Sequence, residues 1–102
     1  MATMITSQDF IDADVVAAKI EAGDFTVYVS PEFEINGETF RVVLDGHHSF
    51  AAASEAGADA DIVEMSATDD DRVALINDPE AFLAACWMDG EYRNAKTGAA
   101  IW

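Results

Sequence analysis

Residues 33–57 read FEINGETFRVVLDGHHSFAAASEAG, and they carry the clearest structural signals in the chain. Asn36-Gly37 separates two segments in which apolar and polar residues alternate, and both residues tolerate the positive φ of a two-residue loop. The alternation therefore predicts a β-hairpin over residues 33–44 in which Phe33 faces Phe40. That register places one set of side chains on the core face: Phe33, Ile35, Phe40, Val42 and Leu44.

A short polar turn and an alanine-rich helix follow the hairpin at once. The turn consists of Asp45, Gly46, His47, His48 and Ser49, and the helix is expected to end at Gly57. Backbone N–H groups and the positive end of the helix dipole meet at such a junction, which favours an anion. Histidines also exchange protons near neutral pH. These five residues are therefore the candidate ligand-binding site, suited to phosphate, a carboxylate or proton transfer.

The rest of the chain predicts a single α+β domain over residues 1–102, with no internal repeat or linker. A strand over residues 61–65 should lie parallel to the second hairpin strand, through a right-handed crossover. The alanines at 51, 52, 53 and 56 should face the sheet closely. The other expected elements are a helix from Ser7 or Asp9 to Gly23, a strand over residues 25–29, and helices starting at Asp69 and Asp78. The tail, with a turn at Thr97-Gly98, is expected to form either a short hairpin or an ordered arm.

Cys86 is the only cysteine, which excludes an internal disulfide. It shares one face of the last predicted helix with Phe82, Leu83 and Trp87, so we expect it to pack in the core rather than to react. Asp69-Asp70-Asp71 is expected to form a solvated first helical turn. Neither feature predicts a metal site.

The balance of charge limits the partners of this chain. Hydrophobic residues make up 51%, enough for a core, but 20 acidic residues face only 5 lysines and arginines, for a net charge of −15. This excess argues against direct binding to nucleic acids and against docking on anionic membranes. No stretch resembles a signal peptide or spans a bilayer, so the expected location is cytoplasmic.

Residues 42–57 resemble the ParB/sulfiredoxin-like superfamily. Its members share an apolar strand, a turn close to Gly-x-His-Arg, and a helix that carries Ala-Ala and ends in glycine. The likeness extends over roughly residues 27–65 and includes the hairpin and the strand after the helix. It implies an α+β fold with a small mixed sheet, of the stand-alone type found in phages and mobile elements.

The resemblance also implies phosphate chemistry at the turn. ParB proteins bind and hydrolyse a cytidine nucleotide, a relative is a serine kinase, and sulfiredoxin reduces a peroxiredoxin sulfinic acid. Gly46 and His48 occupy the family's glycine and histidine positions, whereas Ser49 replaces its arginine. His47 stands where sulfiredoxin has its cysteine, so sulfinic-acid reduction is excluded here. The resemblance implies a nucleotide or small-anion ligand at the Gly46 turn.

Each candidate side chain has a structural alternative. His47 and His48 either contact a ligand or hold the backbone, and since neighbours on a helix point about 100° apart, they are poorly placed to share one metal. Asp45 is a general base, a carboxylate that orients a histidine, or a helix cap. Ser49 is a nucleophile or simply a polar residue of the first turn.

The acidic surplus supports a second hypothesis. Carboxylates crowd the segment from Asp59 to Asp71 and the hairpin from Glu32 to Glu38. Such a surface imitates nucleic-acid phosphates, as in the small acidic anti-restriction and anti-CRISPR proteins of phages. The alternative function is therefore an acidic module that inhibits a basic nucleic-acid-binding host protein. The competing explanation of the acidic surplus is that the charge only keeps the domain soluble.

Overall fold

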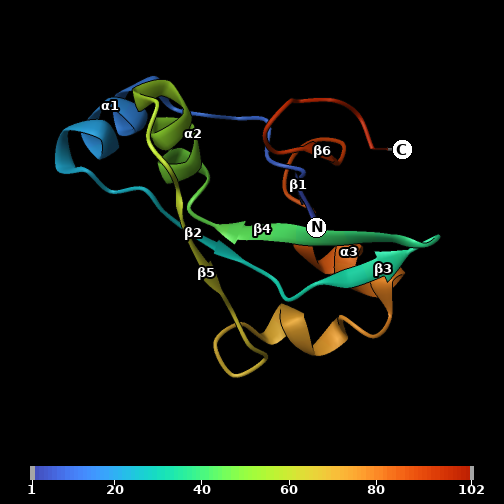
Figure 1. Ribbon diagram of the computed structural model, residues 1–102. Helices are drawn as coiled ribbons and strands as arrows, with labels where there is room; N and C mark the ends of the chain where they lie inside the picture. Colours follow the sequence, from blue (N-terminus) through green and yellow to red (C-terminus); the bar gives the residue numbers. More distant parts are fainter. Residues whose placement is uncertain (1, 102) are drawn as a thin grey trace.

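A mixed β-sheet with strand order β5-β2-β4-β1-β6 lies at the centre of the computed structural model, which describes residues 2–101 (Figure 1). A further strand, β3, pairs with β4. The expected α+β class is confirmed. The strands are β1 (Thr3–Thr6), β2 (Thr26–Val29), β3 (Phe33–Ile35), β4 (Glu38–Asp45), β5 (Asp61–Glu64) and β6 (Arg93–Asn94). The helices are α1 (Ala13–Ala22), α2 (His47–Ala56), the 3₁₀ helix η1 (Asp71–Leu75) and α3 (Pro79–Cys86).

The hairpin of β3 and β4 has the expected loop and register. Phe33 pairs with Phe40 across the two strands, and the loop residues Asn36 and Gly37 both have positive φ. One face of this hairpin packs on η1 and α3, where Phe33 and Phe82 meet edge to face. The buried side chains of this core are Ile5, Phe33, Phe40, Val42, Leu44, Val73, Phe82 and Cys86.

The opposite face of the sheet carries a smaller apolar cluster beneath α2. Val27, Val29 and Val43 are buried there, and Phe50 of α2 packs against them. α2 also packs against α1, and the two helices lie side by side in Figure 1, away from η1 and α3. The sheet therefore brings the start of α2 close to the end of β4.

Among residues 2–101, no helix combines the length and apolar character needed to cross a bilayer.

The structure contains a first strand, β1, that the sequence did not predict, and α1 begins later than expected. Asp12 caps α1, because its carboxylate accepts hydrogen bonds from two backbone N–H groups of the first turn. Ser7 and Asp9, the expected caps, instead hold the end of β1 to the C-terminal tail. The Ser7 hydroxyl accepts a hydrogen bond from Met88 N, and Asp9 pairs with Arg93.

The expected direction of β5 is wrong. β5 pairs in parallel with β2, and β2 runs antiparallel to β4, so β5 is antiparallel to the strand that precedes α2. The reason is that both edges of β4 are already taken. β1 pairs along one edge, while β2 and β3 pair along the other. The chain leaving α2 therefore adds to the free edge of β2.

The C-terminal half differs from expectation at two elements and agrees at a third. The helix expected at Asp69 is the 3₁₀ helix η1, and Asp70 caps it while binding the Arg72 guanidinium. α3 does begin after Asp78, as expected, but it ends at Cys86, which leaves Trp87 57% exposed rather than in the core. The expected tail hairpin is present as β6 with an isolated bridge to Ala100.

Candidate functional site

Gly46 forms the turn at the centre of the candidate site. It joins β4 to α2 and has a positive φ of 86°. A Cβ atom at this position would lie 2.6 Å from the Thr26 carbonyl oxygen and 3.0 Å from Val27 Cα. The absent side chain therefore makes room for β2. The backbone of β2 fills the space on this side of Gly46.

The start of α2 has no side-chain cap among the described residues. The Asp45 carboxylate instead accepts a hydrogen bond of 2.7 Å from the N–H of Gly46, its own neighbour. The N–H groups at the start of α2 are consequently available to an external acceptor, and the helix dipole adds a partial positive charge there. The hypothesis that Asp45 caps α2 is therefore wrong.

A shallow hollow of about 190 Å³ lies against this uncapped start, and we call it the Gly46 hollow. The structure brings all five candidate residues from the sequence to its wall, together with two that the sequence did not indicate. These seven residues are Gln8, Lys19, Asp45, Gly46, His47, His48 and Ser49. Lys19 adds a positive charge from α1, although its ammonium already binds Asp24 at 2.8 Å.

His48 and Ser49 have structural partners. His48 Nε2 accepts a hydrogen bond of 3.1 Å from Asp12 N, so it ties the start of α2 to the cap of α1. Ser49 is 2% exposed, and its hydroxyl donates to an Asp24 carboxylate oxygen at 3.5 Å. Lys19 holds the pKa of Asp24 below its usual range by hydrogen bonding to it. This arrangement favours the structural alternative for both side chains.

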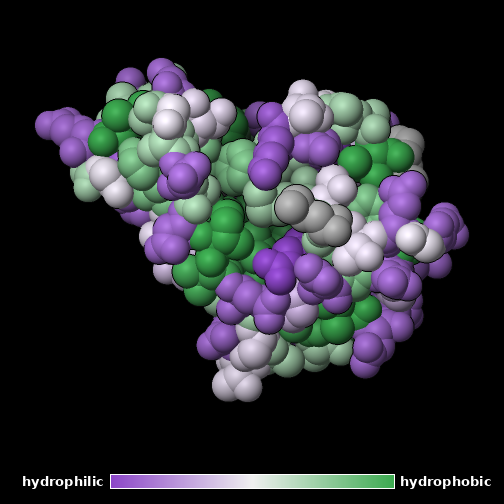
Figure 2. Space-filling model, viewed as in Figure 1, coloured by the Kyte–Doolittle hydropathy of each residue, from purple (hydrophilic) through white to green (hydrophobic). Residues whose placement is uncertain are grey.

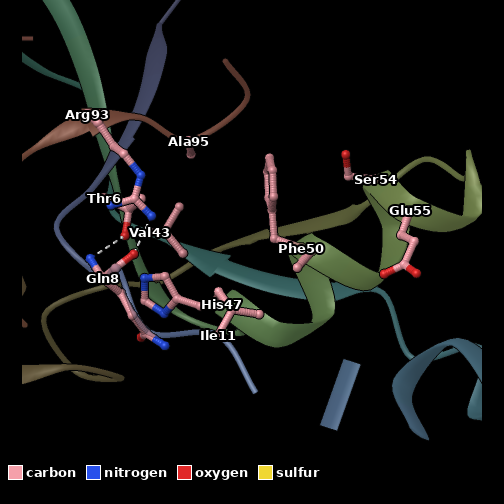
Figure 3. A pocket seen from close by; sticks show the side chains of 11 residues that line it. Thr6, Gln8, Ile11, Val43, His47, Phe50, Ser54, Glu55, Arg93 and Ala95 are labelled. Atoms are coloured by element: carbon pink, nitrogen blue, oxygen red, sulfur yellow. Dashed lines mark hydrogen bonds between the residues drawn. The ribbon is translucent and has the colours of Figure 1, made fainter. Parts of the chain in front are cut away.

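His47 lines the Gly46 hollow and also a second opening, the Phe50 cleft, which Figure 3 shows. This cleft of about 300 Å³ lies between α2 and the end of the sheet formed by β1 and β6. Burial lowers the pKa of His47 to about 4, and Asp45 offsets only part of that effect. The imidazole is therefore neutral at pH 7. Its Nε2 atom is buried and has no hydrogen-bond partner in the described part of the chain.

Arg93 is the residue of this region that sequence reasoning missed. Its guanidinium binds the Asp9 carboxylate and the Gln8 carbonyl oxygen, which are 84 and 85 residues away along the chain. No local pattern marks such a contact. The one available signal is the scarcity of basic residues. In a chain with only 5 lysines and arginines, each of them is a candidate for a structural ion pair.

The described residues form no cluster of three or more His, Cys, Asp or Glu side chains that would hold a metal ion. The two histidines diverge, as their adjacency on a helix predicts. Asp69 and Asp70 are occupied locally: Asp69 accepts hydrogen bonds from Ser66, and Asp70 binds Arg72. The site chemistry is therefore that of backbone N–H groups, one lysine and one neutral imidazole.

No protein-family model, curated protein sequence or solved structure matches this chain. The likeness of residues 42–57 to the ParB/sulfiredoxin-like superfamily consequently stays a resemblance of motif and element order. The features that bear on function are the geometry at the start of α2 and the cleft beside it.

Proposed function

We propose that this chain is a ParB/sulfiredoxin-like domain that binds a small phosphate-type anion or a nucleotide in the Gly46 hollow. The observation that carries the proposal is the uncapped start of α2, which opens on that hollow. Backbone N–H groups and the helix dipole together attract phosphate groups in many folds. Lys19, in the same wall, supplies a cationic side chain.

The order of elements supports the same proposal. β4, the Gly46 turn, the alanine-containing helix α2, the Gly57 stop and β5 follow one another as in the superfamily. The family arginine is replaced by Ser49, which is buried and offers no guanidinium to the hollow. The anion contacts would therefore come from the backbone and Lys19, without the bidentate grip of arginine.

We propose binding without catalysis at this site. The Ser49 side chain is the one hydroxyl among the five turn residues, and it is buried and bonded to Asp24. The imidazole of His48 is bonded to the backbone at Asp12, before α1, and that of His47 lines both openings. A bound phosphate ester would thus meet no free hydroxyl beside a general base.

Asp45 offers the sharpest test, because its exposed carboxylate stands in the wall of the hollow and repels an anion. Asp45→Asn removes the charge and keeps an oxygen that accepts from Gly46 N. We expect it to tighten phosphate binding about threefold, the effect of one charge at roughly 6 Å in water. The measurement is calorimetric titration with inorganic phosphate, ATP and CTP at fixed ionic strength.

Glu38→Gln is the matched control, since it removes one exposed carboxylate at the distant hairpin tip. If both variants bind the anions more tightly by the same factor, the net charge of the chain explains the gain in affinity and the hollow is not the binding site. If none of the three proteins binds any of the ligands at millimolar concentration, the proposed function is wrong.

The alternative, an acidic module that binds a basic protein, receives less support. A mimic of nucleic acid needs its carboxylates gathered in one band. Exposed carboxylates lie on α1, at the hairpin tip and on η1, three separate parts of the molecule in Figure 1. Figure 2 likewise shows hydrophilic residues spread over the visible face and interrupted by apolar ones. This distribution favours the role of the charge in solubility.

A further inference from the structure

The Phe50 cleft adjoins the Gly46 hollow, since Gln8 and His47 line both, but it has a different character. Its walls come from elements far apart in the sequence, and Figure 3 shows His47 and Phe50 of α2 on one side, with Gln8 and Arg93 across from them. Most of the wall surface is apolar; Gln8, His47 and Arg93 form a polar end near β1, and Ser54 and Glu55 stand at the other end. The residues that matter here are Val43, Phe50, Ala51 and Ala95 on the apolar side, and Gln8 and His47 at the polar end.

His47 Nε2 is the unusual atom of this wall. It is shielded from solvent, and no atom of the described residues forms a hydrogen bond with it. Buried polar atoms in folded proteins nearly always have a partner, so each exception requires an explanation. Because the His47 side chain lines an open cleft, a bound molecule that reaches this nitrogen through a slight turn of the ring would supply the missing partner.

The charges around the cleft indicate what kind of molecule fits. Burial keeps the His47 imidazole neutral, and the charge of Arg93 is already balanced by Asp9. Glu55, at the opposite end, would repel an anion. The charge of Arg93 further disfavours protonation of the imidazole, and a neutral imidazole keeps one ring nitrogen able to accept a hydrogen bond. The polar end of the cleft therefore offers uncharged acceptors, with an unpartnered ring nitrogen among its polar atoms.

We propose that the Phe50 cleft binds an uncharged aromatic molecule of one or two rings, which stacks on Phe50 and donates a hydrogen bond to His47 Nε2. The volume of about 300 Å³ lies at the lower end of the range for small-molecule sites, which limits the ligand to this size. Offset stacking on Phe50 supplies the attraction for a flat ring. This ligand class is distinct from the anion proposed for the Gly46 hollow.

The first experiment compares indole with 1-methylindole, which has the same rings but no N–H. Both are titrated into the full chain and followed by two-dimensional amide NMR. We expect indole to shift signals of α2, β6 and the end of β1, and to bind up to about tenfold more tightly than 1-methylindole, the contribution of one hydrogen bond. Equal affinities, or shifts centred elsewhere, overturn the proposal.

Two variants then test the contacts. His47→Phe keeps a ring of similar size and removes the nitrogen, so indole and 1-methylindole should bind this variant with equal affinity. Ala51→Leu fills the cleft from the helix that forms its floor and should abolish binding of both. Trp87→Leu is the control, because Trp87 is an exposed aromatic side chain outside this wall. Its loss should leave indole binding unchanged.

Thermal melting establishes that each variant is folded. Should His47→Phe not fold, the ligand pair in the natural chain and the Ala51→Leu result decide the matter. Indole binding that survives Ala51→Leu, or that disappears in Trp87→Leu, contradicts the proposal. Phosphate titration of the same samples keeps the two sites apart, because Ala51→Leu should not alter anion binding at the Gly46 hollow.

Discussion

Gly46 lets the end of β4 pass in contact with β2 before α2 begins. Gly46→Ala would combine a φ of 86° with a Cβ atom only 2.6 Å from the Thr26 carbonyl oxygen. We expect it to lower the free energy of unfolding by roughly 2–4 kcal/mol, from a left-handed residue and a local clash together. Urea unfolding followed by circular dichroism measures the loss.

Gly57→Ala is the natural control for this substitution. Gly57 also has a positive φ, of 67°, but a Cβ atom there meets nothing within 4 Å. It should lose only the conformational part, about 1–2 kcal/mol. If the two variants are equally destabilised, the close approach of β2 to Gly46 plays no part in the stability of the junction.

His47 predicts a dependence of stability on pH. Its pKa is about 4 in the folded chain and 6.5 as an ordinary histidine, so the unfolded chain takes up a proton first as the pH falls. The contribution of the neutral imidazole is therefore fully present above pH 6.5 and is lost between 6.5 and 4. Since the ring is partly exposed, we expect a loss of about 1 kcal/mol between pH 7 and 5.

The measurement is urea unfolding of the natural chain and of His47→Gln at both pH values. Relief of carboxylate repulsion acts on both proteins, so only their difference reports His47. The natural chain should lose stability relative to the variant on acidification. A constant difference would mean that the imidazole is solvated in the folded state.

The sequence predicted which side chains gather at the start of α2 but not which contacts they make there. Glycine and two histidines after a strand identify the turn from local pattern. The partner of His48 is the backbone at Asp12, and that of Ser49 is Asp24, 36 and 25 residues away. Only the packing of α1 against α2 creates those contacts, and the sequence did not specify that packing.

Among the elements, those defined by local chemistry were predicted well. The Asn36-Gly37 loop fixes the hairpin, and the Gly57 stop and the Asp78-Pro79 start fix the ends of α2 and α3. β1 was missed because its four residues carry no alternation that distinguishes them from a leader to α1. The direction of β5 was missed because it depends on which edges of the sheet are free.

Ala53 and Ala56 allow the orientation of α2 to be tested. Both were expected to face the sheet, but Ala53 is 2% exposed while Ala56 is on the solvent side. Ala53→Leu should overpack the helix and lower the unfolding free energy by roughly 1–3 kcal/mol. Ala56→Leu should change it by less than about 0.5 kcal/mol. Thermal and urea unfolding of the pair compare them, and equal effects would mean that α2 is rotated about its axis.

On the scale of the whole molecule, the few cations serve to join elements. Arg41 links β4 to Glu64 at the end of β5, and Arg72 binds Asp70 while donating to the Leu44 carbonyl oxygen. Lys19 and Arg93 are also paired with carboxylates. Each such pair near the surface contributes at most about 1 kcal/mol. Most of the 20 acidic side chains therefore have no compensating charge nearby.

Added salt should consequently stabilise this chain. Salt screens the ion pairs and the mutual repulsion of the carboxylates alike, but a net charge of −15 makes repulsion the larger effect. We expect the melting temperature to rise by several degrees between low and about 0.5 M sodium chloride, since about 1 kcal/mol corresponds to roughly 4–8 °C for this size. Glu34→Gln with Glu38→Gln, both on the hairpin, should melt higher at low salt and gain less from salt. A melting temperature that falls with salt would show that the ion pairs outweigh the repulsion.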